Sequence, residues 1–203
     1  MVLAVAWMLA SYLLGSLPVG ILLSRVKGRD PRRVGSGNIG ATNVMRAAGK
    51  TLGVLTLLGD ILKGFLPARL ALHFGQPGVV VAGAGLAAFA GHLFPLYLRF
   101  KGGKGVATAL GVFLALSPTA VLMVLPVFAA VLFLWGYVSL GSLVGTALMP
   151  LALLGLNAPL SSVLTCAIMA VAIFVRHREN IKRLMSGKEN RILRKRRPRG
   201  ERA

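Results

Sequence analysis

The chain has 203 residues, of which 56% are hydrophobic and 14% charged, a composition that excludes an ordinary soluble globular domain. Its formal net charge is +19, but the apolar blocks between the basic residues are too long for a nucleic-acid-binding protein, so we expect no nucleic-acid partner. One cysteine, three histidines and five carboxylates cannot supply a disulfide framework or a conventional multi-ligand metal centre. We therefore predict no metal site and no cofactor.

The first apolar segment, residues 2–23, is long enough to cross a bilayer. It lacks the basic start and small-residue cleavage pattern of a signal peptide, which predicts a retained transmembrane helix. Beyond it, Lys and Arg gather in three clusters, at residues 24–50, 99–104 and 176–202. Because clustered basic residues mark the cytoplasmic side, the three clusters are expected to share a side, with an even number of spans between successive clusters.

The apolar sequence between the clusters divides accordingly. Two spans fit between the first two clusters and four between the last two, with breaks expected near residues 74–78, 117–118, 136–139 and 157–159. The run Val106–Leu116 is short, so we expect it to be tilted, surrounded by protein or inserted from one face. With the first helix, this predicts an all-α bundle of seven transmembrane helices over residues 1–189, its N-terminus outside and its C-terminus in the cytoplasm.

Residues 190–203 form the second predicted unit, a basic tail that matches no motif. We expect this tail to be disordered and held by anionic lipid headgroups, at about 1 kcal/mol per charge near the surface.

The first polar segment is GSGNIGATNVMR, residues 35–46. It matches G-x-G-x-x-G, but no strand precedes it and a span follows, which argues against a dinucleotide site. Its glycines alternate with side chains that form hydrogen bonds, and a cation follows at Arg46. Thr42 is expected to cap a short helix running to Gly49, with Arg46 near the capped end. The alternative is an ordinary polar turn.

The second polar segment is GHLFPLYLRFKGGKGVAT, residues 91–108. Lys101 and Lys104 stand among three glycines just before a new apolar run. Glycines allow close backbone approach, amides at a helix start point at an anion, and the lysines add charge that a phosphate would neutralise. The combination indicates a phosphate site at the membrane surface. The alternative is that the lysines only anchor a helix end among lipid headgroups.

The third polar segment is HRENIKRL, residues 177–184. The last span is expected to continue through it as a helix, which would place His177, Asn180 and Leu184 on one face. Glu179 is expected to pair with Arg183, worth about 0.3–0.5 kcal/mol at the surface. His177 is either a proton carrier or hydrogen-bond donor, or a structural residue.

Two charged residues and a histidine lie at or inside the spans. Asp60 and Lys63 are spaced i, i+3 within the second span, and intramembrane charges are usually paired or functional. We expect them to pair with each other or with the first polar segment, or else to contact substrate. His92 is equally compatible with a structural role and with a ligand contact.

SGNIGATNVMR, GHLFPLYLRFKGGKGVAT and HRENIKRL together resemble the three signature regions of the PlsY family, integral-membrane acyl-phosphate:glycerol-3-phosphate acyltransferases of bacterial phospholipid synthesis. The resemblance covers nearly the whole chain. It implies seven helices in the bacterial inner membrane, with an active site at the cytoplasmic face. It also implies acyl transfer from a fatty acyl phosphate to the 1-hydroxyl of glycerol 3-phosphate, giving lysophosphatidic acid and inorganic phosphate.

Matching positions carry the family's site residues over to this chain. The resemblance implies that the catalytic residues are Ser36, Arg46, Lys104, His177 and Asn180. The substrate-binding residues would be Gly37, Asn38, Gly40, Thr42, Asn43, Lys101, Gly102 and Gly103.

The chemistry that fits these residues is direct attack of the glycerol hydroxyl on the acyl carbonyl. An acyl phosphate is a mixed anhydride with a good leaving group, and the chain has neither the H-x-x-x-x-D signature of acyl-CoA-dependent enzymes nor a G-x-S-x-G elbow. Arg46, Lys104 and the amides near Gly40 and Gly103 would hold the phosphates. Either His177 or a substrate phosphate accepts the proton. A Ser36 acyl-enzyme is the less favoured variant.

Two other functions remain possible for such a sequence. A transporter or channel for phosphate-bearing anions would need a polar path, but residues 106–175 contain no Lys, Arg, Asp, Glu or His. A lipid-binding scaffold acting through the basic tail would leave the glycine and asparagine motifs unexplained. The sequence makes no prediction of oligomeric state or acyl-chain preference.

Overall fold

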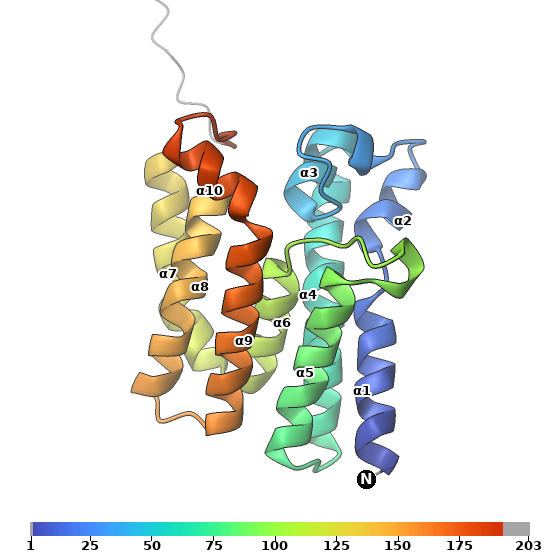
Figure 1. The fold of residues 1–203 in the computed structure, drawn as a ribbon, viewed down its shortest axis with the longest axis vertical. Coiled ribbons are helices and arrows are strands. Elements are labelled where there is room, and N and C mark those ends of the chain that lie inside the picture. Colours follow the sequence, from blue (N-terminus) through green and yellow to red (C-terminus); the bar gives the residue numbers. More distant parts are fainter. Residues whose placement is uncertain (1, 193–203) are drawn as a thin grey trace, which may run out of the picture.

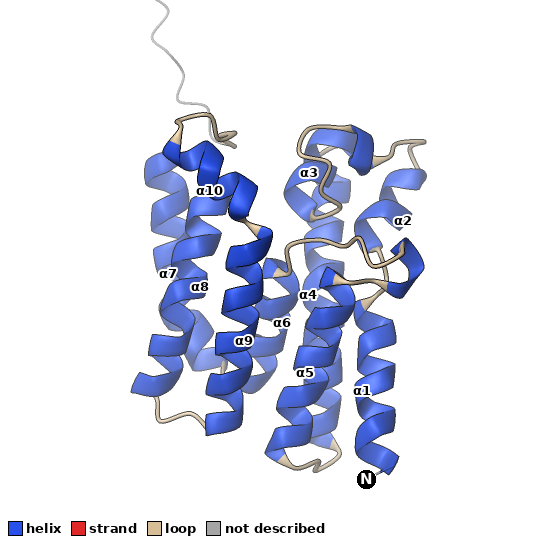
Figure 2. Cartoon of the chain, in the orientation of Figure 1, coloured by secondary structure: helices blue, strands red, loops and turns tan. Residues whose placement is uncertain are grey.

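The computed structural model describes residues 2–192, and all regular secondary structure in that range is helical (Figure 2). The α-helices are α1 (Val2–Gly15), α2 (Val19–Arg25), α3 (Ala41–Ala48), α4 (Lys50–His73), α5 (Gly78–Leu93), α6 (Val106–Leu116), α7 (Pro118–Trp135), α8 (Val138–Gly155), α9 (Leu160–Arg176) and α10 (Arg178–Met185). Short 3-10 turns cover Pro31–Arg33 and Leu96–Leu98. Every break predicted between apolar segments is present.

Five helical segments are long and apolar enough to cross a membrane, and they make this a multi-pass membrane protein. The segment α9 with α10 is a sixth candidate if the pair counts as one span, but the two helices are bent by 58°. The expectation that α9 continues as one helix through HRENIKRL is therefore wrong, because the chain turns at His177. The helix α6 has 11 residues, as short as the sequence predicts.

The first span is also broken, which the sequence does not predict. Its two parts, α1 and α2, are separated at residues 16–18, where Pro18 has no amide hydrogen to donate. The carbonyl of Leu17 instead accepts a hydrogen bond of 2.8 Å from Lys63 Nζ on α4. A buried cation from another helix thus satisfies the backbone at the break.

The helices α1 to α5 lie on one side of the bundle and α7 to α10 on the other, with α6 between them (Figure 1). Glycines bring α4 and α6 into backbone contact. A Cβ on Gly64 would lie 2.1 Å from the carbonyl oxygen of Thr108, and one on Gly111 would lie 2.0 Å from that of Ile61. Such close approach requires glycine on both helices. These contacts fix the position of α6 along α4, so that α6 begins deep in the bundle.

The three basic clusters share one end of the bundle, as predicted. The segments that carry them are the α2–α3 connection, the loop before α6, and α10. All lie in the half of the bundle opposite the start of α1, with the loop before α6 deeper than the other two (Figure 1). Of the predicted tail, residues 193–203 lie outside the described part of the chain. Ile192 donates its amide to the carbonyl of Gly136 at 2.9 Å, and the Arg191 guanidinium lies 5.1 Å from the Tyr137 ring centroid.

Candidate active site

A cavity of about 490 Å³ opens among the polar segments and extends between α6, α7, α8 and α9. Residues from all three segments that the sequence singles out line it, among them Ser36, Asn38, Gly40, Thr42, Asn43, Arg46, Lys104, His177 and Asn180. Four of the predicted substrate-binding residues, Gly37, Lys101, Gly102 and Gly103, are not part of this lining. Nine of the thirteen predicted site residues are thus brought together around one space.

The deeper part of the cavity is apolar. Its walls include Phe113 of α6, Leu125 and Phe128 of α7, Met149 of α8 and Met169 of α9. Apolar walls favour a hydrocarbon ligand over water, whereas the mouth offers cations and amides. The cavity is therefore suited to a molecule with a charged head and an apolar chain.

The first polar segment leads into α3, and the cap of this helix differs from the prediction. Gly40, not Thr42, occupies the N-cap, and no side chain caps the helix. Thr42 lies inside the first turn. Arg46 is in the last turn of α3 rather than near its start, and its side chain still reaches the cavity lining.

Asn43 holds the loop of this segment together. Its side chain is 2% exposed, and its Oδ1 accepts the amide of Ser36 at 3.1 Å. Its Nδ2 lies within hydrogen-bond distance of three backbone carbonyls, those of Pro31, Val34 and Asn38, at 2.7, 3.0 and 2.8 Å. These bonds occupy the amide group of Asn43, so its contribution to the site is to position Ser36.

The backbone of the second polar segment is hydrogen-bonded to the end of α5. The amide of Gly102 donates to the carbonyl of Leu93 at 3.2 Å, and the amide of Gly103 donates to that of His92 at 3.1 Å. The expectation that amides near Gly103 hold a phosphate is therefore wrong for these two groups. The amide of Gly40 is likewise occupied, by Asn38 Oδ1 at 3.3 Å.

Besides Lys104, the second segment lines the cavity with the start of α6. Gly105, Val106 and Ala107 line it, and the first amides of a helix have no partner within the helix. Gly105 has φ = 87°, a backbone conformation that glycine adopts without strain. The second segment thus supplies a helix start and one cation, Lys104, at the cavity.

Lys104 is the centre of a polar network that links the second and third segments. Its Nζ donates to Asn180 Oδ1, and Asn180 Nδ2 donates to Glu189 Oε1 at 2.7 Å. Arg183 and Ser139 also donate to this carboxylate, at 2.7 and 2.9 Å. Burial, together with nearby arginines, lowers the pKa of Lys104 to about 8.

Glu189 is a site residue that the sequence reasoning missed. Burial alone would raise its pKa, but hydrogen bonds from Arg183, Asn180 and Ser139 hold the pKa below its usual range. The predicted partner of Arg183, Glu179, is instead exposed and lies 3.7 Å from Lys182 Nζ. Gly187, with φ = 68°, was the available signal that the chain reverses after α10.

His177 stands at the bend between α9 and α10 and is 3% exposed. Its Nδ1 lies 2.8 Å from the carbonyl oxygen of Ile173, so this nitrogen carries the hydrogen and Nε2 is the free acceptor. Burial and the charge of Lys104 lower the pKa of His177 to about 4. The imidazole is therefore neutral at physiological pH.

Asp60 and Lys63 pair within α4, as predicted. Lys63 Nζ lies 2.9 Å from Asp60 Oδ1, and both side chains are 4% exposed. His92 Nδ1 is 3.6 Å from the same carboxylate oxygen. Asp60 and His92 line the cavity below its mouth, whereas Lys63 does not.

The fold and the site define a class: a multi-pass helical membrane protein whose cationic site opens onto an apolar cavity. A family model for glycerol-3-phosphate acyltransferase matches residues 5–187. The chain is 50% identical over 183 residues to the glycerol-3-phosphate acyltransferase of Geotalea daltonii, covering 90% of this chain and 94% of that relative. It is 53% identical over 184 residues to that of Halorhodospira halophila, covering 89% and 92%.

Two solved structures of the same kind of enzyme also match this chain. The crystal structure of PlsY (YgiH), an integral membrane glycerol 3-phosphate acyltransferase, in its glycerol 3-phosphate form matches with a TM-score of 0.90 and 44% identity, covering 94% of this chain and 96% of that one. The lysophosphatidic acid form matches with a TM-score of 0.87 and 43% identity, covering 93% and 94%. This chain belongs to the PlsY family of glycerol-3-phosphate acyltransferases, and it is an acyltransferase.

Proposed function

We propose that this protein transfers a fatty acyl group from an acyl phosphate to the 1-hydroxyl of glycerol 3-phosphate, releasing lysophosphatidic acid and inorganic phosphate. The observation that carries the proposal is the cavity itself, where Lys104, Arg46 and the start of α6 surround the mouth of an apolar space. Both proposed substrates carry phosphate, and the acyl donor also carries an apolar chain. The relatives named above are glycerol-3-phosphate acyltransferases, which supports the choice of acceptor.

In the proposed reaction the 1-hydroxyl oxygen attacks the acyl carbonyl directly. A new ester C–O bond forms, the carbonyl C–O bond to the phosphate breaks, and the phosphate leaves with the electron pair of that bond. Lys104, Arg46 and the start of α6, at Gly105 and Val106, line the space where the charge of the leaving group would grow. Ser36 would orient the polyol at the mouth. No acyl-enzyme is needed.

The geometry favours a substrate phosphate as proton acceptor. A pKa of about 4 makes His177 a weak base at neutral pH. A phosphate monoester, with a second pKa near 6, is the stronger base in the site. His177 would then act through its free Nε2 or through its packing at the bend. In the same proposal, Asn180 positions Lys104, to which it is hydrogen-bonded.

The membrane arrangement is part of the proposal. We place seven spans in the bacterial inner membrane, with α6 counted as a short span enclosed by its neighbours. The shared end of the three basic clusters would face the cytoplasm, by the positive-inside rule, and the N-terminus the outside. Residues 1–189 would form the enzyme domain, and residues beyond 189 a basic extension that binds anionic lipid.

The experiment is phosphate release by the detergent-purified protein given palmitoyl phosphate and glycerol 3-phosphate, with palmitoyl-CoA in parallel. Phosphate released in step with lysophosphatidic acid, and only from the acyl phosphate, is the expected result. Product formed from the thioester would overturn the donor while leaving the enzyme class intact. A folded protein that gives no product from either donor would overturn the reaction. His177→Gln tests the proton acceptor, and near-normal turnover is expected.

A further inference from the structure

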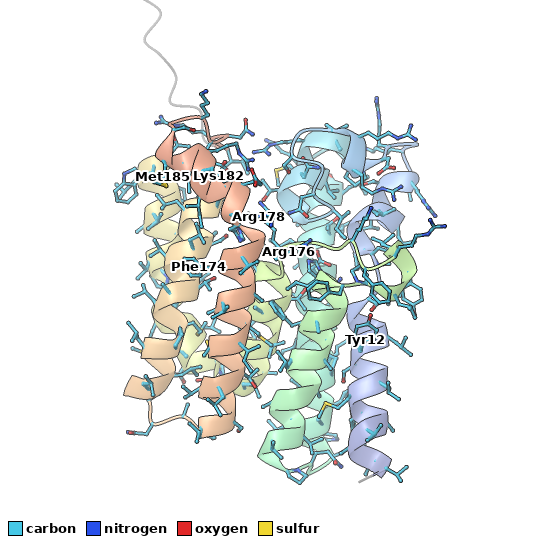
Figure 3. The ribbon with its side chains drawn as sticks, viewed as in Figure 1. Tyr12, Phe174, Arg176, Arg178, Lys182 and Met185 are labelled. Atoms are coloured by element: carbon cyan, nitrogen blue, oxygen red, sulfur yellow. The ribbon has the colours of Figure 1, made fainter. Side chains whose placement is uncertain are left out.

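The loop before α6 is held from two sides, by Arg176 on α9 and by the end of α5. On one side, Arg176 at the end of α9 donates from Nε to the carbonyl of Gly103 at 3.0 Å and from Nη2 to the carbonyl of Gly102 at 2.6 Å. Figure 3 labels Arg176 and Arg178 near the upper end of this helix. Arg176 was assigned no role in the site by the sequence motifs, and it does not line the cavity.

The other side of the loop rests on the end of α5. Both glycine amides donate to carbonyls there, and the space is filled so closely that no side chain fits. A Cβ on Gly102 would lie 2.1 Å from the carbonyl oxygen of His92, and one on Gly103 would lie 2.2 Å from His92 Nε2. Glycine is therefore needed at both positions for packing against the end of α5.

His92, against which the loop packs, lies in the core of the bundle. His92 is 4% exposed and faces the carboxylate of Asp60, which is paired with Lys63. Lys63 in turn donates to the carbonyl of Leu17 at the α1–α2 break. The His92 ring lies beside this ion pair without a hydrogen bond at Nδ1, and the His92 carbonyl accepts the amide of Gly103. Arg176 holds the same loop from the last span. Lys104 is the next residue after Gly103.

We propose that Arg176 is a positioning residue for the reaction: by clamping the carbonyls of Gly102 and Gly103 against the His92 side of the fold, it holds Lys104 at the cavity. The planar guanidinium suits this task because one side chain donates to two neighbouring carbonyls in a fixed geometry. The inference rests on the proposed function, in which Lys104 binds a substrate phosphate.

The test compares Arg176→Gln, Arg176→Lys and, as a matched control, Arg178→Gln. Arg178 is two residues away and carries the same charge, but its side chain is 77% exposed. Its Nε lies 3.7 Å from Oε1 of the neighbouring Glu179, which is a surface ion pair. The measurements are kcat and KM for glycerol 3-phosphate and for the acyl phosphate, with the thermal midpoint Tm of each variant in detergent. Wild type and Arg178→Gln must first show the proposed activity, and their inactivity would count against the function rather than the clamp.

A positioning role predicts that Arg176→Gln raises KM for the acyl phosphate, whose phosphate Lys104 faces, by about tenfold while the Tm stays close to that of wild type. Partial unfolding alone would lower kcat and leave KM unchanged, because the surviving fraction is normal enzyme. Arg176→Lys keeps the charge but cannot donate to both carbonyls, so its KM should also rise. Normal KM in Arg176→Lys would show that only charge matters and would overturn the clamp, as would normal KM in Arg176→Gln.

A second variant keeps the inference testable if Arg176→Gln does not fold. Gly103→Ala pushes the loop from the His92 side without removing any charge. It should raise KM for the acyl phosphate in the same direction as Arg176→Lys. An unchanged KM in a stable Gly103→Ala protein would overturn the proposal, because the position of the loop would then not matter.

Discussion

The two glycine-containing segments at the cavity mouth are held in opposite ways. The segment before α3 is largely exposed, and a single buried side chain, that of Asn43, ties its backbone together. The segment before α6 is tied by its own backbone to α5 and by Arg176 to α9. The first therefore presents several polar groups to the cavity, whereas the second presents one cation and a helix start. In the first segment Gly35 and Gly37 adopt positive φ angles that glycine favours, whereas Gly102 and Gly103 of the second segment are needed for packing.

The largest expected effect comes from removing the cation that the second segment presents. Lys104→Gln should lower kcat/KM by about 10³-fold, because the site loses the charge that offsets the growing negative charge of the leaving phosphate. Steady-state phosphate release measures it. The variant should fold, since glutamine still donates to Asn180. Activity within a few fold of wild type would contradict the central place given to Lys104.

The next effect comes from loosening the first segment. Asn43→Asp is nearly isosteric, but a carboxylate cannot donate to the carbonyls of Pro31, Val34 and Asn38. We expect the free energy of unfolding to fall by about 2–3 kcal/mol, since buried acceptors lose their donor, and turnover to fall about tenfold as Ser36 moves. Thermal unfolding and steady-state kinetics measure the two effects.

Asn43→Ala separates positioning from charge repulsion. It removes the three bonds from Nδ2 without burying a carboxylate, and it also removes the acceptor of the Ser36 amide, so its turnover should fall at least as far. If both variants bound glycerol 3-phosphate and turned over as wild type does, the loop would not depend on Asn43, and the contrast between the two segments would fail.

How far the sequence predicts this molecule depends on the range of the interactions involved. Pro118, Gly136 and Asn157 end or begin helices through local backbone chemistry, so the breaks between spans could be placed correctly. The shared side of the basic clusters follows from charge alone. The break at Pro18 was not predicted from the local sequence, because the hydrogen bond that stabilises it comes from Lys63, which is distant in the chain.

The same distinction applies to the site. Nine predicted residues line the cavity because the motifs mark chemistry that any ligand-bearing segment must expose. Glu189 and Arg176 act through partners on other helices, and nothing local in their sequence indicates those partners. The pairing of the Gly102 amide with Leu93 likewise depends on how α5 and the loop meet. Most of the predicted residues line the cavity, whereas Glu189 and Arg176, whose partners are distant in the sequence, were not predicted.

A pH profile tests the burial of Lys104. Its pKa of about 8 means that the ammonium is present below that pH and is lost as pH rises through it. In the free enzyme, kcat/KM should therefore fall on the alkaline side with a midpoint near pH 8, by about tenfold for each further pH unit. Lys104→Arg carries a guanidinium that stays protonated, so its remaining activity should show no such limb. A limb that persists in Lys104→Arg would assign the titration to another group.

The smallest effect is expected at the other lysine of the same loop. Lys101 is exposed and does not line the cavity, although its position in the motif made it a candidate for phosphate binding. Lys101→Gln should change kcat/KM by less than about twofold at physiological ionic strength, because salt screens an exposed charge. Steady-state kinetics beside Lys104→Gln measures it. A loss comparable to that of Lys104→Gln would show that the loop rearranges to bring Lys101 to the substrate, and that the paired backbone of Gly102 and Gly103 opens during the reaction.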